Sequence, residues 1–200
     1  MLKTIFLSKE ESSTLKSLKT VFSSPSKEIP EEYDLLEKGQ YVGSNIDEVA
    51  QLALLLRPWV KPNAHVLDLG SGDGRVVFTL AILWKNVYIT GIEYNSALFK
   101  YSQKIKENIS PELKKRVKFF KKDFLEEDFG LYDIIFYYYW GTWEEDKLVE
   151  KLNKEVNTKA LLILYGHGMD KTKLEKNFLQ AYKFIENPEI EPFACILVKI

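Results

Sequence analysis

The sequence predicts an α/β fold, a doubly wound sheet with helices on both faces, from three observations. A β-rich stretch at 64–69 runs into a loop of three glycines at 70–74. The almost wholly apolar stretch 76–84 follows and is long enough for a buried crossover helix. Two more β-rich stretches, 86–92 and 117–121, are each followed within two residues by an acid. Acids at successive strand ends are typical of a parallel sheet that binds a ligand at one edge.

The glycine loop separates Gly70, Gly72 and Gly74 by single residues. Because glycine has no Cβ, the backbone can approach a ligand closely, and unpaired N–H groups at the helix start favour a negatively charged or carboxylate-bearing group. The dinucleotide fingerprint G-x-G-x-x-G would need a glycine in place of Arg75, so the loop argues against NAD. A tight turn without a ligand is the alternative.

The acids after the second and third predicted strands suit a nucleoside. Glu93, at the end of 86–92, can accept hydrogen bonds from both ribose hydroxyls. Asp123, after 117–121, can accept one from an adenine amino group, and Phe124 can pack on the ring. Each acid alone is more often a plain surface carboxylate. Together, at the carboxyl ends of successive strands, they favour a nucleotide-type ligand.

The string Asp-Leu-Gly-Ser-Gly-Asp-Gly-Arg at 68–75 resembles motif I of the class I S-adenosylmethionine-dependent methyltransferases. The resemblance covers residues 46–200 and implies a Rossmann-like sheet of seven strands, closed by an antiparallel C-terminal hairpin from 178–186 and 193–200. It also implies S-adenosylmethionine as the cofactor and S-adenosylhomocysteine as the product. In that family the acidic residue, here Asp68, and the loop backbone hold the methionine end of the cofactor.

A capped helix and a Tyr-Val turn precede the first strand. The apolar spacing predicts the helix over 46–59, with Ser44 as its N-cap. With motif I, the turn at Tyr41 and Val42 resembles small protein lysine methyltransferases of archaea and their mitochondrial relatives in eukaryotes, although Gly43 stands where that group usually has proline. The resemblance implies that the turn closes over the methionine part of the cofactor. A loop aromatic packed under the helix is the alternative.

The candidate cofactor-binding residues come from this turn, the glycine loop and the two acidic strand ends. They are Tyr41, Val42, Asp68, Gly70, Ser71, Gly72, Glu93, Tyr94, Asp123 and Phe124. With two histidines and one cysteine, the sequence offers no metal-ligand cluster at useful spacing, and we expect no metal.

The predicted fourth strand, 132–139, is crowded with aromatic residues at its end. In the family that the chain resembles, this end faces the methyl group that is transferred. Ring faces guide an amine and hold a cationic product by cation–π attraction, so Tyr139 and Trp140 are the candidate catalytic residues. The strand end carries no Asn-Pro-Pro-Tyr or Asp-Pro-Pro-Tyr string, which disfavours methylation of base amines or glutamine amides. Core packing is the alternative for any one tyrosine.

Acidic residues just after these aromatics, Glu144, Glu145 and Asp146, are candidates to receive a proton from the amine. A solvated first turn of a helix is the alternative. His167, which follows the predicted fifth strand at 159–165, is a candidate base, with a structural role as the alternative.

The chain has 200 residues, of which 46% are hydrophobic, and can bury one substantial core. We expect an N-terminal extension at 1–40, followed by a methyltransferase domain at 41–200. The extension holds an amphipathic helix over 8–22 and a linker over 23–30. The helix is expected to pack on the domain edge, with a mobile lid over the cofactor as the alternative.

The charge is balanced, since 28 basic and 29 acidic residues give a net charge of −1, so charge does not support a nucleic-acid partner. The sequence shows no apolar run of the length of a membrane span or of a signal peptide. The single cysteine, Cys195, fits a reducing compartment, and we expect a cytoplasmic protein.

The expected activity is in-line methyl transfer from S-adenosylmethionine to the lysine amine of a protein substrate. Two alternatives use the same cofactor site: a methyltransferase for a small metabolite or a structured RNA, and a non-catalytic cofactor-binding module that acts through a partner.

Overall fold

The computed structural model describes residues 7–23, 27, 29–31, 34–140, 144–167, 173–174, 177–184 and 194–200. Within them one sheet contains β3 (His65–Leu69), β4 (Tyr88–Glu93), β5 (Val117–Lys121), β6 (Ile134–Trp140), β7 (Leu161–His167), β8 (Phe178–Phe184) and β9 (Ala194–Lys199). The helices are α1 (Lys9–Ser23), α2 (Ile46–Leu56), α3 (Arg75–Leu83), α4 (Ser96–Glu107), α5 (Pro111–Arg116) and α6 (Glu145–Glu155). The other elements are the 3₁₀ turns η1 (Arg57–Trp59), η2 (Phe124–Glu126) and η3 (Phe129–Leu131), and a hairpin of β1 (Leu35–Leu36) and β2 (Gly39–Gln40).

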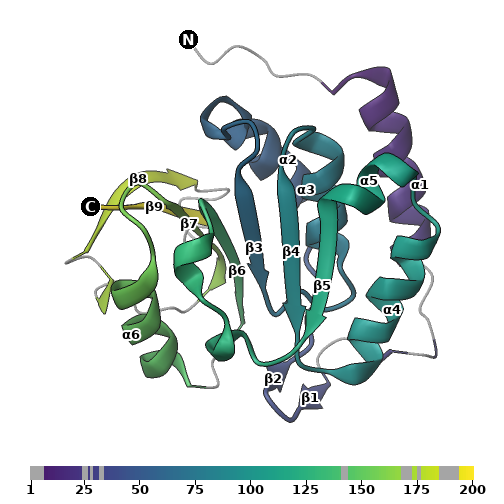
Figure 1. The fold of residues 1–200 in the computed structure, drawn as a ribbon. Helices are drawn as coiled ribbons and strands as arrows, with labels where there is room; N and C mark the ends of the chain where they lie inside the picture. Colours follow the sequence, from purple (N-terminus) through teal and green to yellow (C-terminus); the bar gives the residue numbers. More distant parts are fainter. Residues whose placement is uncertain are drawn as a thin grey trace.

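The sheet has the strand order β5-β4-β3-β6-β7-β9-β8, and β9 alone runs antiparallel to its neighbours (Figure 1). From β3 the chain winds outward to β5, returns to β6 on the other side of β3, and then winds outward again. This confirms the predicted doubly wound sheet with its C-terminal antiparallel hairpin. Ligands of such sheets bind where the strand order reverses, at the carboxyl ends of the strands, which places the site at the ends of β3 and β6.

Each face of the sheet buries its own core, because successive side chains of a strand point to opposite faces. Val66 and Phe136 pack in a core with α1, α2 and α3. Leu67 and Ile135, one position away on the same strands, pack in a second core with α6. The predicted placement of helices on both faces is therefore confirmed.

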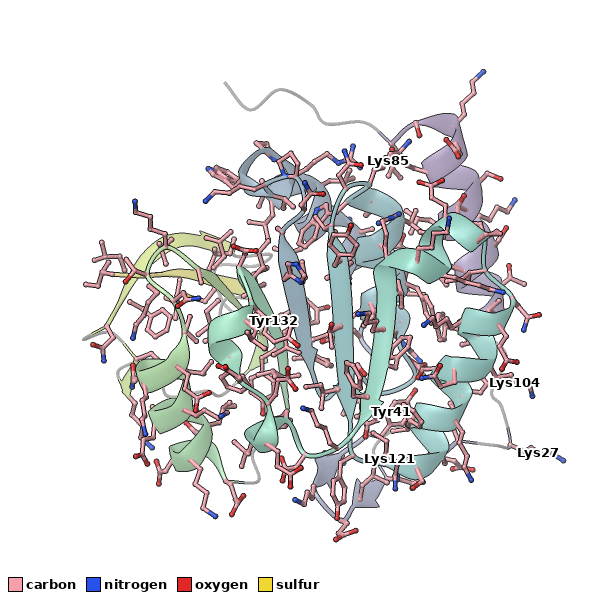
Figure 2. All side chains as sticks on the ribbon, in the orientation of Figure 1. Lys27, Tyr41, Lys85, Lys104, Lys121 and Tyr132 are labelled. Atoms are coloured by element: carbon pink, nitrogen blue, oxygen red, sulfur yellow. The ribbon has the colours of Figure 1, made fainter. Side chains whose placement is uncertain are left out.

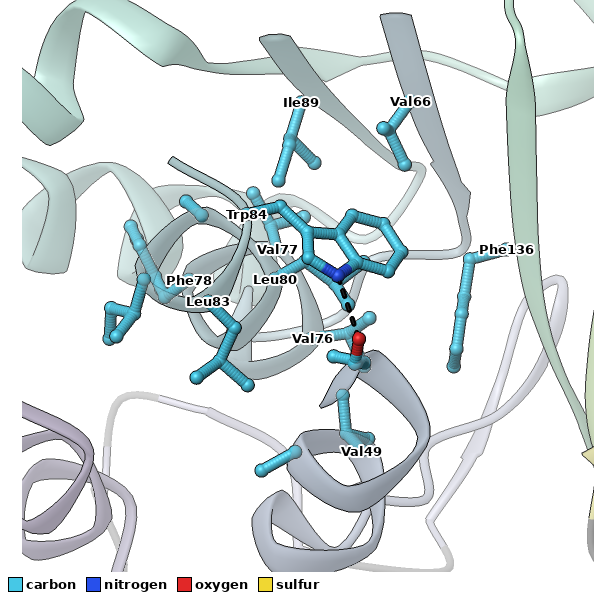
Figure 3. Packing of buried hydrophobic residues seen from close by; sticks show 14 of the residues in the cluster. Val49, Val66, Val76, Val77, Phe78, Leu80, Leu83, Trp84, Ile89 and Phe136 are labelled. Atoms are coloured by element: carbon cyan, nitrogen blue, oxygen red, sulfur yellow. Dashed lines mark hydrogen bonds between the residues drawn. The ribbon is translucent and has the colours of Figure 1, made fainter. Parts of the chain in front are cut away.

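Trp84 joins two helices of the first core. It follows the last residue of α3 and is only 2% exposed. Its indole N–H donates to the carbonyl of Ala53 in α2 at 2.9 Å, which satisfies the polar atom of an otherwise apolar side chain (Figure 3). Around it, the apolar residues of α3 are buried on every side, as the long apolar run predicted.

The N-terminal helix α1 packs on α3, with Leu15 and Leu18 buried in the first core. A capping box starts α1: the Ser8 backbone N–H donates to Glu11 Oε2, and the Glu11 N–H donates to Ser8 Oγ. The other carboxylate oxygen of Glu11 accepts from Arg57 at 2.9 Å, which ties α1 to η1. The predicted domain boundary after residue 40 stays a prediction.

Two local predictions need correction. The N-cap of α2 is Asn45 and not Ser44, because the Asn45 side chain accepts from the Asp47 N–H at 2.9 Å, while Ser44 is buried. The helix predicted to Trp59 ends at Leu56 and continues as η1, where proline 58 cannot donate the backbone hydrogen bond of an α-helix. Residues 24–26 and 28 of the predicted linker, and the predicted turn at 187–192, lie outside the described residues.

In the described part of the chain, none of the helices combines the length and the apolar character that crossing a bilayer requires. The same part of the chain contains no group of three or more His, Cys, Asp or Glu side chains placed to hold a metal ion.

Candidate functional site

A cavity of about 130 Å³ lies at the carboxyl ends of β3, β4 and β6, where the topology places a ligand. The structure brings all ten candidate cofactor-binding residues into its lining: Tyr41, Val42, Asp68, Gly70, Ser71, Gly72, Glu93, Tyr94, Asp123 and Phe124. Figure 2 shows Tyr41 at the same end of the sheet as Lys121, the last residue of β5. Residues far apart in the sequence therefore form one site.

Asp68 presents a buried carboxylate that lacks a full set of partners. It is 2% exposed at the end of β3, and its Oδ2 has no hydrogen-bond partner among the described residues. Burial, and then repulsion from Glu93 and Asp73, raise the pKa of Asp68 well above the usual value. An ammonium group bound beside Asp68 would satisfy the unpaired oxygen and stabilise its charge.

The glycine loop needs its glycines for conformation and for space. Gly72 and Gly74 have φ of 54° and 89°, in the left-handed region that other residues rarely adopt. A Cβ on Gly74 would also lie 2.9 Å from the rings of Phe78 and Phe119, so α3 could not pack against β5 as it does. The loop backbone is therefore held close to the sheet.

Glu93 connects the end of β4 to this loop. Its two carboxylate oxygens accept from the Gly72 N–H at 2.8 Å and from the Asn95 N–H at 2.6 Å. Burial raises the pKa of Glu93, and these backbone hydrogen bonds oppose that rise. Because each carboxylate oxygen has a second lone pair, Glu93 can still accept the two ribose hydroxyls predicted for it.

Asp123 already has a partner at each carboxylate oxygen. Its Oδ1 accepts from the Leu125 N–H and caps η2, and its Oδ2 accepts from the ammonium of Lys38. Lys38 lies in the turn between β1 and β2 and also lines the cavity, with its ammonium 4.4 Å from the centre of the Tyr94 ring. The β1–β2 hairpin therefore closes the cavity on the side predicted for adenine. This contact helps to explain why the cavity is smaller than the roughly 300–1,000 Å³ of typical ligand pockets.

At the end of β6, the cavity is lined by Tyr137 and Tyr138. The Tyr137 ring packs against Phe124 with centroids 6.0 Å apart, while the Tyr138 ring lies 4.8 Å from that of Tyr165 on the other face of the sheet. The backbones of Tyr139 and Trp140 continue β6 and pair with β7, and their side chains lie outside what the structure describes.

The candidate proton acceptors begin α6, as the alternative interpretation of a solvated helical turn expected. Glu144 forms an ion pair with Lys147, and Asp146 pairs with Lys173 at 2.7 Å on the surface. These acids do not line the cavity. His167 ends β7, and its side chain is outside the described atoms.

Sequence reasoning missed three charged residues of the cavity lining: Lys38, Asp73 and Arg75. Arg75 entered only as an argument against NAD, and Asp73 only as a letter of motif I. A signal was available, because an Asp and an Arg two residues apart in a loop that packs against a buried strand need partners.

The comparisons with known proteins agree with this geometry. The sequence model of the family described as the ANTKMT methyltransferase domain matches residues 68–176, more than half of the chain. The chain belongs to this family. A curated relative from Caenorhabditis elegans, an ATP synthase lysine N-methyltransferase, is 33% identical over 96 residues, which are 46% of this chain. The match spans 48% of the relative's own length.

Solved methyltransferase structures share the fold. An RNA methyltransferase from Salinibacter ruber in complex with S-adenosyl-L-homocysteine aligns with a TM-score of 0.57 and 20% identity, covering 78% of this chain and 91% of that one. A precorrin-6y C5,15-methyltransferase from Geobacter metallireducens aligns with a TM-score of 0.57 and 15% identity, covering 86% of this chain and 94% of that one. At these identities the similarity shows the fold alone.

The cofactor of this ANTKMT-family domain is S-adenosylmethionine. The residues of the cavity fit it. The unpaired oxygen of Asp68 suits the ammonium of the methionine part, and the positions of Glu93 and Asp123 at neighbouring strand ends suit the ribose and the adenine. The domain is thus an S-adenosylmethionine-dependent methyltransferase domain.

Proposed function

We propose that the protein methylates lysine side chains of a protein substrate. The observation that carries the proposal is the lysine N-methyltransferase from Caenorhabditis elegans, whose 33% identity extends over 96 residues. The aromatic end of β6 supports it, because Tyr137 and Tyr138 give the cavity ring faces that suit an amine rather than a polar amide or base edge.

The bound cofactor supplies a methyl group on a sulfonium, and the residues of the site orient it. Asp68 holds the ammonium, Glu93 the ribose hydroxyls, and Asp123 with Phe124 the adenine. This assignment leaves the end of β6 for the acceptor. The reaction needs no covalent bond to the protein, so positioning and exclusion of water supply most of the rate.

The ring of Tyr138 is held in place from behind. Tyr165 is buried against it, and the Tyr165 hydroxyl donates to the carboxylate of Glu48 in the first turn of α2. A fixed ring beside the cavity loses little conformational entropy when an amine binds against it. Tyr138 therefore suits the guidance of an acceptor better than a mobile surface tyrosine would.

The acceptor amine must lose its proton before it attacks. A free lysine has a pKa of about 10.4, so presenting it neutral at pH 7 costs roughly 4 to 5 kcal/mol. The aromatic lining lowers this cost, because an apolar surrounding disfavours the ammonium form. Water at the cavity mouth receives the proton.

The test is transfer of label from radiolabelled S-adenosylmethionine to separate protein, RNA and metabolite pools. The proposal expects label in protein, located on lysine by mass spectrometry of the digest, and no label with the Asp68→Asn variant. Label in RNA or metabolites alone would overturn the lysine assignment. Cofactor binding without transfer to any pool would favour an interaction module. The cytoplasmic location expected from the sequence stays a prediction.

A further inference from the structure

A buried polar cluster adjoins the glycine loop and is formed by Tyr41, Asp73 and Arg75. The guanidinium of Arg75 donates to Asp73 through Nε and Nη2, at 3.1 Å to Oδ1 and 2.7 Å to Oδ2. The Tyr41 hydroxyl donates to the same Oδ2 at 3.0 Å and accepts from Arg75 Nη2 at 3.2 Å. Asp73 and Tyr41 are 2% and 6% exposed. Each of the three contacts the other two, so the cluster is closed.

The cluster fixes the Tyr41 ring against the loop. A Cβ on Gly72 would lie only 3.4 Å from Tyr41 Cε2, so the ring lies directly against the Gly72 backbone. The Gly72 N–H is the one that donates to Glu93. Tyr41, Asp73 and Arg75 also line the same cavity as Asp68. The cluster is thus part of the wall at the end of the cavity where Asp68 presents its carboxylate.

Arg75 connects this wall to the N-terminal part of the chain. Its Nη1 donates to the Ser44 carbonyl at 3.4 Å, and its guanidinium lies 5.3 Å from the ring centre of Phe22 in α1. The planar guanidinium offers five donors in a fixed fork, which suits the simultaneous contacts to Asp73, Tyr41 and Ser44. A lysine at this position offers one point charge and cannot reproduce them.

We propose that Asp73 and Arg75 are positioning residues that hold Tyr41 over the glycine loop and shape the part of the cavity that receives the amino-acid end of the cofactor. Arg75 has a second effect, since its charge offsets that of Asp73 beside Asp68. The carboxylate of Asp68 can then meet the cofactor ammonium. The proposal rests on the cofactor and not on the acceptor, so failure of the lysine assignment would leave it intact.

The test compares two ligands that differ only in the amino-acid part. S-adenosylhomocysteine contains this part, and 5′-methylthioadenosine keeps the adenosine but lacks it. By calorimetry, Arg75→Lys and Tyr41→Phe are expected to weaken S-adenosylhomocysteine roughly five- to thirtyfold, the size of one or two lost hydrogen bonds. Binding of 5′-methylthioadenosine is expected to stay within about twofold of wild type. The double variant should lose less than the product of the single losses, because both substitutions break one cluster.

Arg57→Lys is the matched control. Arg57 also pairs with a buried carboxylate, that of Glu11, but it does not line the cavity. This control should leave the affinity ratio of the two ligands unchanged even if it lowers the melting temperature. Equal losses for both ligands in Arg75→Lys, or no loss, would overturn the positioning role. If Arg75→Lys does not fold, Tyr41→Phe decides by the same ratio, since it keeps the ring.

Discussion

The ammonium of Lys38 donates a hydrogen bond to the carboxylate of Asp123, the group predicted to accept from adenine. The two residues lie on the β1–β2 hairpin and after β5, and the pair is partly exposed. The hydrogen bond to Asp123 raises the pKa of Lys38, so the ammonium stays charged at neutral pH. Lys38 therefore competes with the cofactor for Asp123.

Replacing Lys38 should release this competition. We expect Lys38→Met to bind S-adenosylhomocysteine about two- to fivefold more tightly than wild type, the size of a partly exposed ion pair. Calorimetry checks the affinity. Lys121→Met removes an equal charge near the same strand end from an exposed position, so it controls for the change in net charge. Weaker binding in Lys38→Met alone would mean that Lys38 is a wall of the adenine site and not a competitor.

Glu93→Ala should lower both stability and cofactor affinity, because Glu93 has two tasks. It accepts from the backbone N–H groups of Gly72 and Asn95, and it is placed for the ribose. Each N–H group left without a partner costs roughly 1 to 3 kcal/mol in the free energy of unfolding, measured by urea denaturation. Glu93→Gln retains one acceptor oxygen and should lie between wild type and Glu93→Ala. Unchanged affinity in both variants would remove Glu93 from the cofactor site.

Asp68→Asn should stabilise the free protein and weaken cofactor binding. The pKa of Asp68 is raised by burial and then by Glu93 and Asp73, so the native state holds this proton to a higher pH than the unfolded chain. Stability therefore falls as the pH rises from about 3.9 toward the raised pKa, and it stays lower above it. Asparagine does not ionise and avoids this loss. Thermal melts over a pH series should show the variant more stable than wild type above that range.

The cofactor reverses the order of the two proteins. Its ammonium pairs with ionised Asp68, so the variant should lose roughly 1.5 to 3 kcal/mol of binding free energy, about ten- to 150-fold in affinity. Asp47→Asn, at a position whose side chain is 63% exposed, should change neither quantity to this extent. A variant that is less stable than wild type without cofactor would mean that Asp68 has a structural partner and no vacant oxygen.

The sequence predicted the fold and the cavity lining because both follow from short-range patterns. Glycines that need positive φ, and acids such as Glu93 and Asp123 at strand ends, are visible in a few consecutive residues. The cap of α2 failed because Ser44 and Asn45 are both good caps, and only the burial of Ser44 decides between them.

The contacts that sequence reasoning missed join distant parts of the chain. Lys38 reaches Asp123 from strands of two residues each, too short to show an alternating pattern. Tyr41 reaches Asp73 across 32 positions, and no local rule pairs them. Such pairs depend on the packing of α1 and the hairpin onto the sheet, which only the folded structure specifies.

The end of β6 separates the possible acceptors. If a lysine is guided by Tyr139 and Trp140, Tyr139→Ala and Trp140→Ala should each lower turnover on protein substrate by about ten- to thirtyfold, the size of a lost cation–π or packing contact of roughly 1 to 2 kcal/mol. Cofactor affinity should change little, because the contact is on the acceptor side. Phenylalanine at either position keeps a ring face and should restore much of the rate.

Trp59→Ala provides the control for Trp140→Ala. Trp59 is 58% exposed on η1 and does not line the cavity, so its removal should leave turnover at the wild-type value. Tyr138→Ala differs from both, because it also removes the packing against Tyr165 and should lower the melting temperature. The guidance model requires that turnover and cofactor affinity separate in the alanine variants of Tyr139 and Trp140. Wild-type turnover in both variants would show that the acceptor does not pass between these rings.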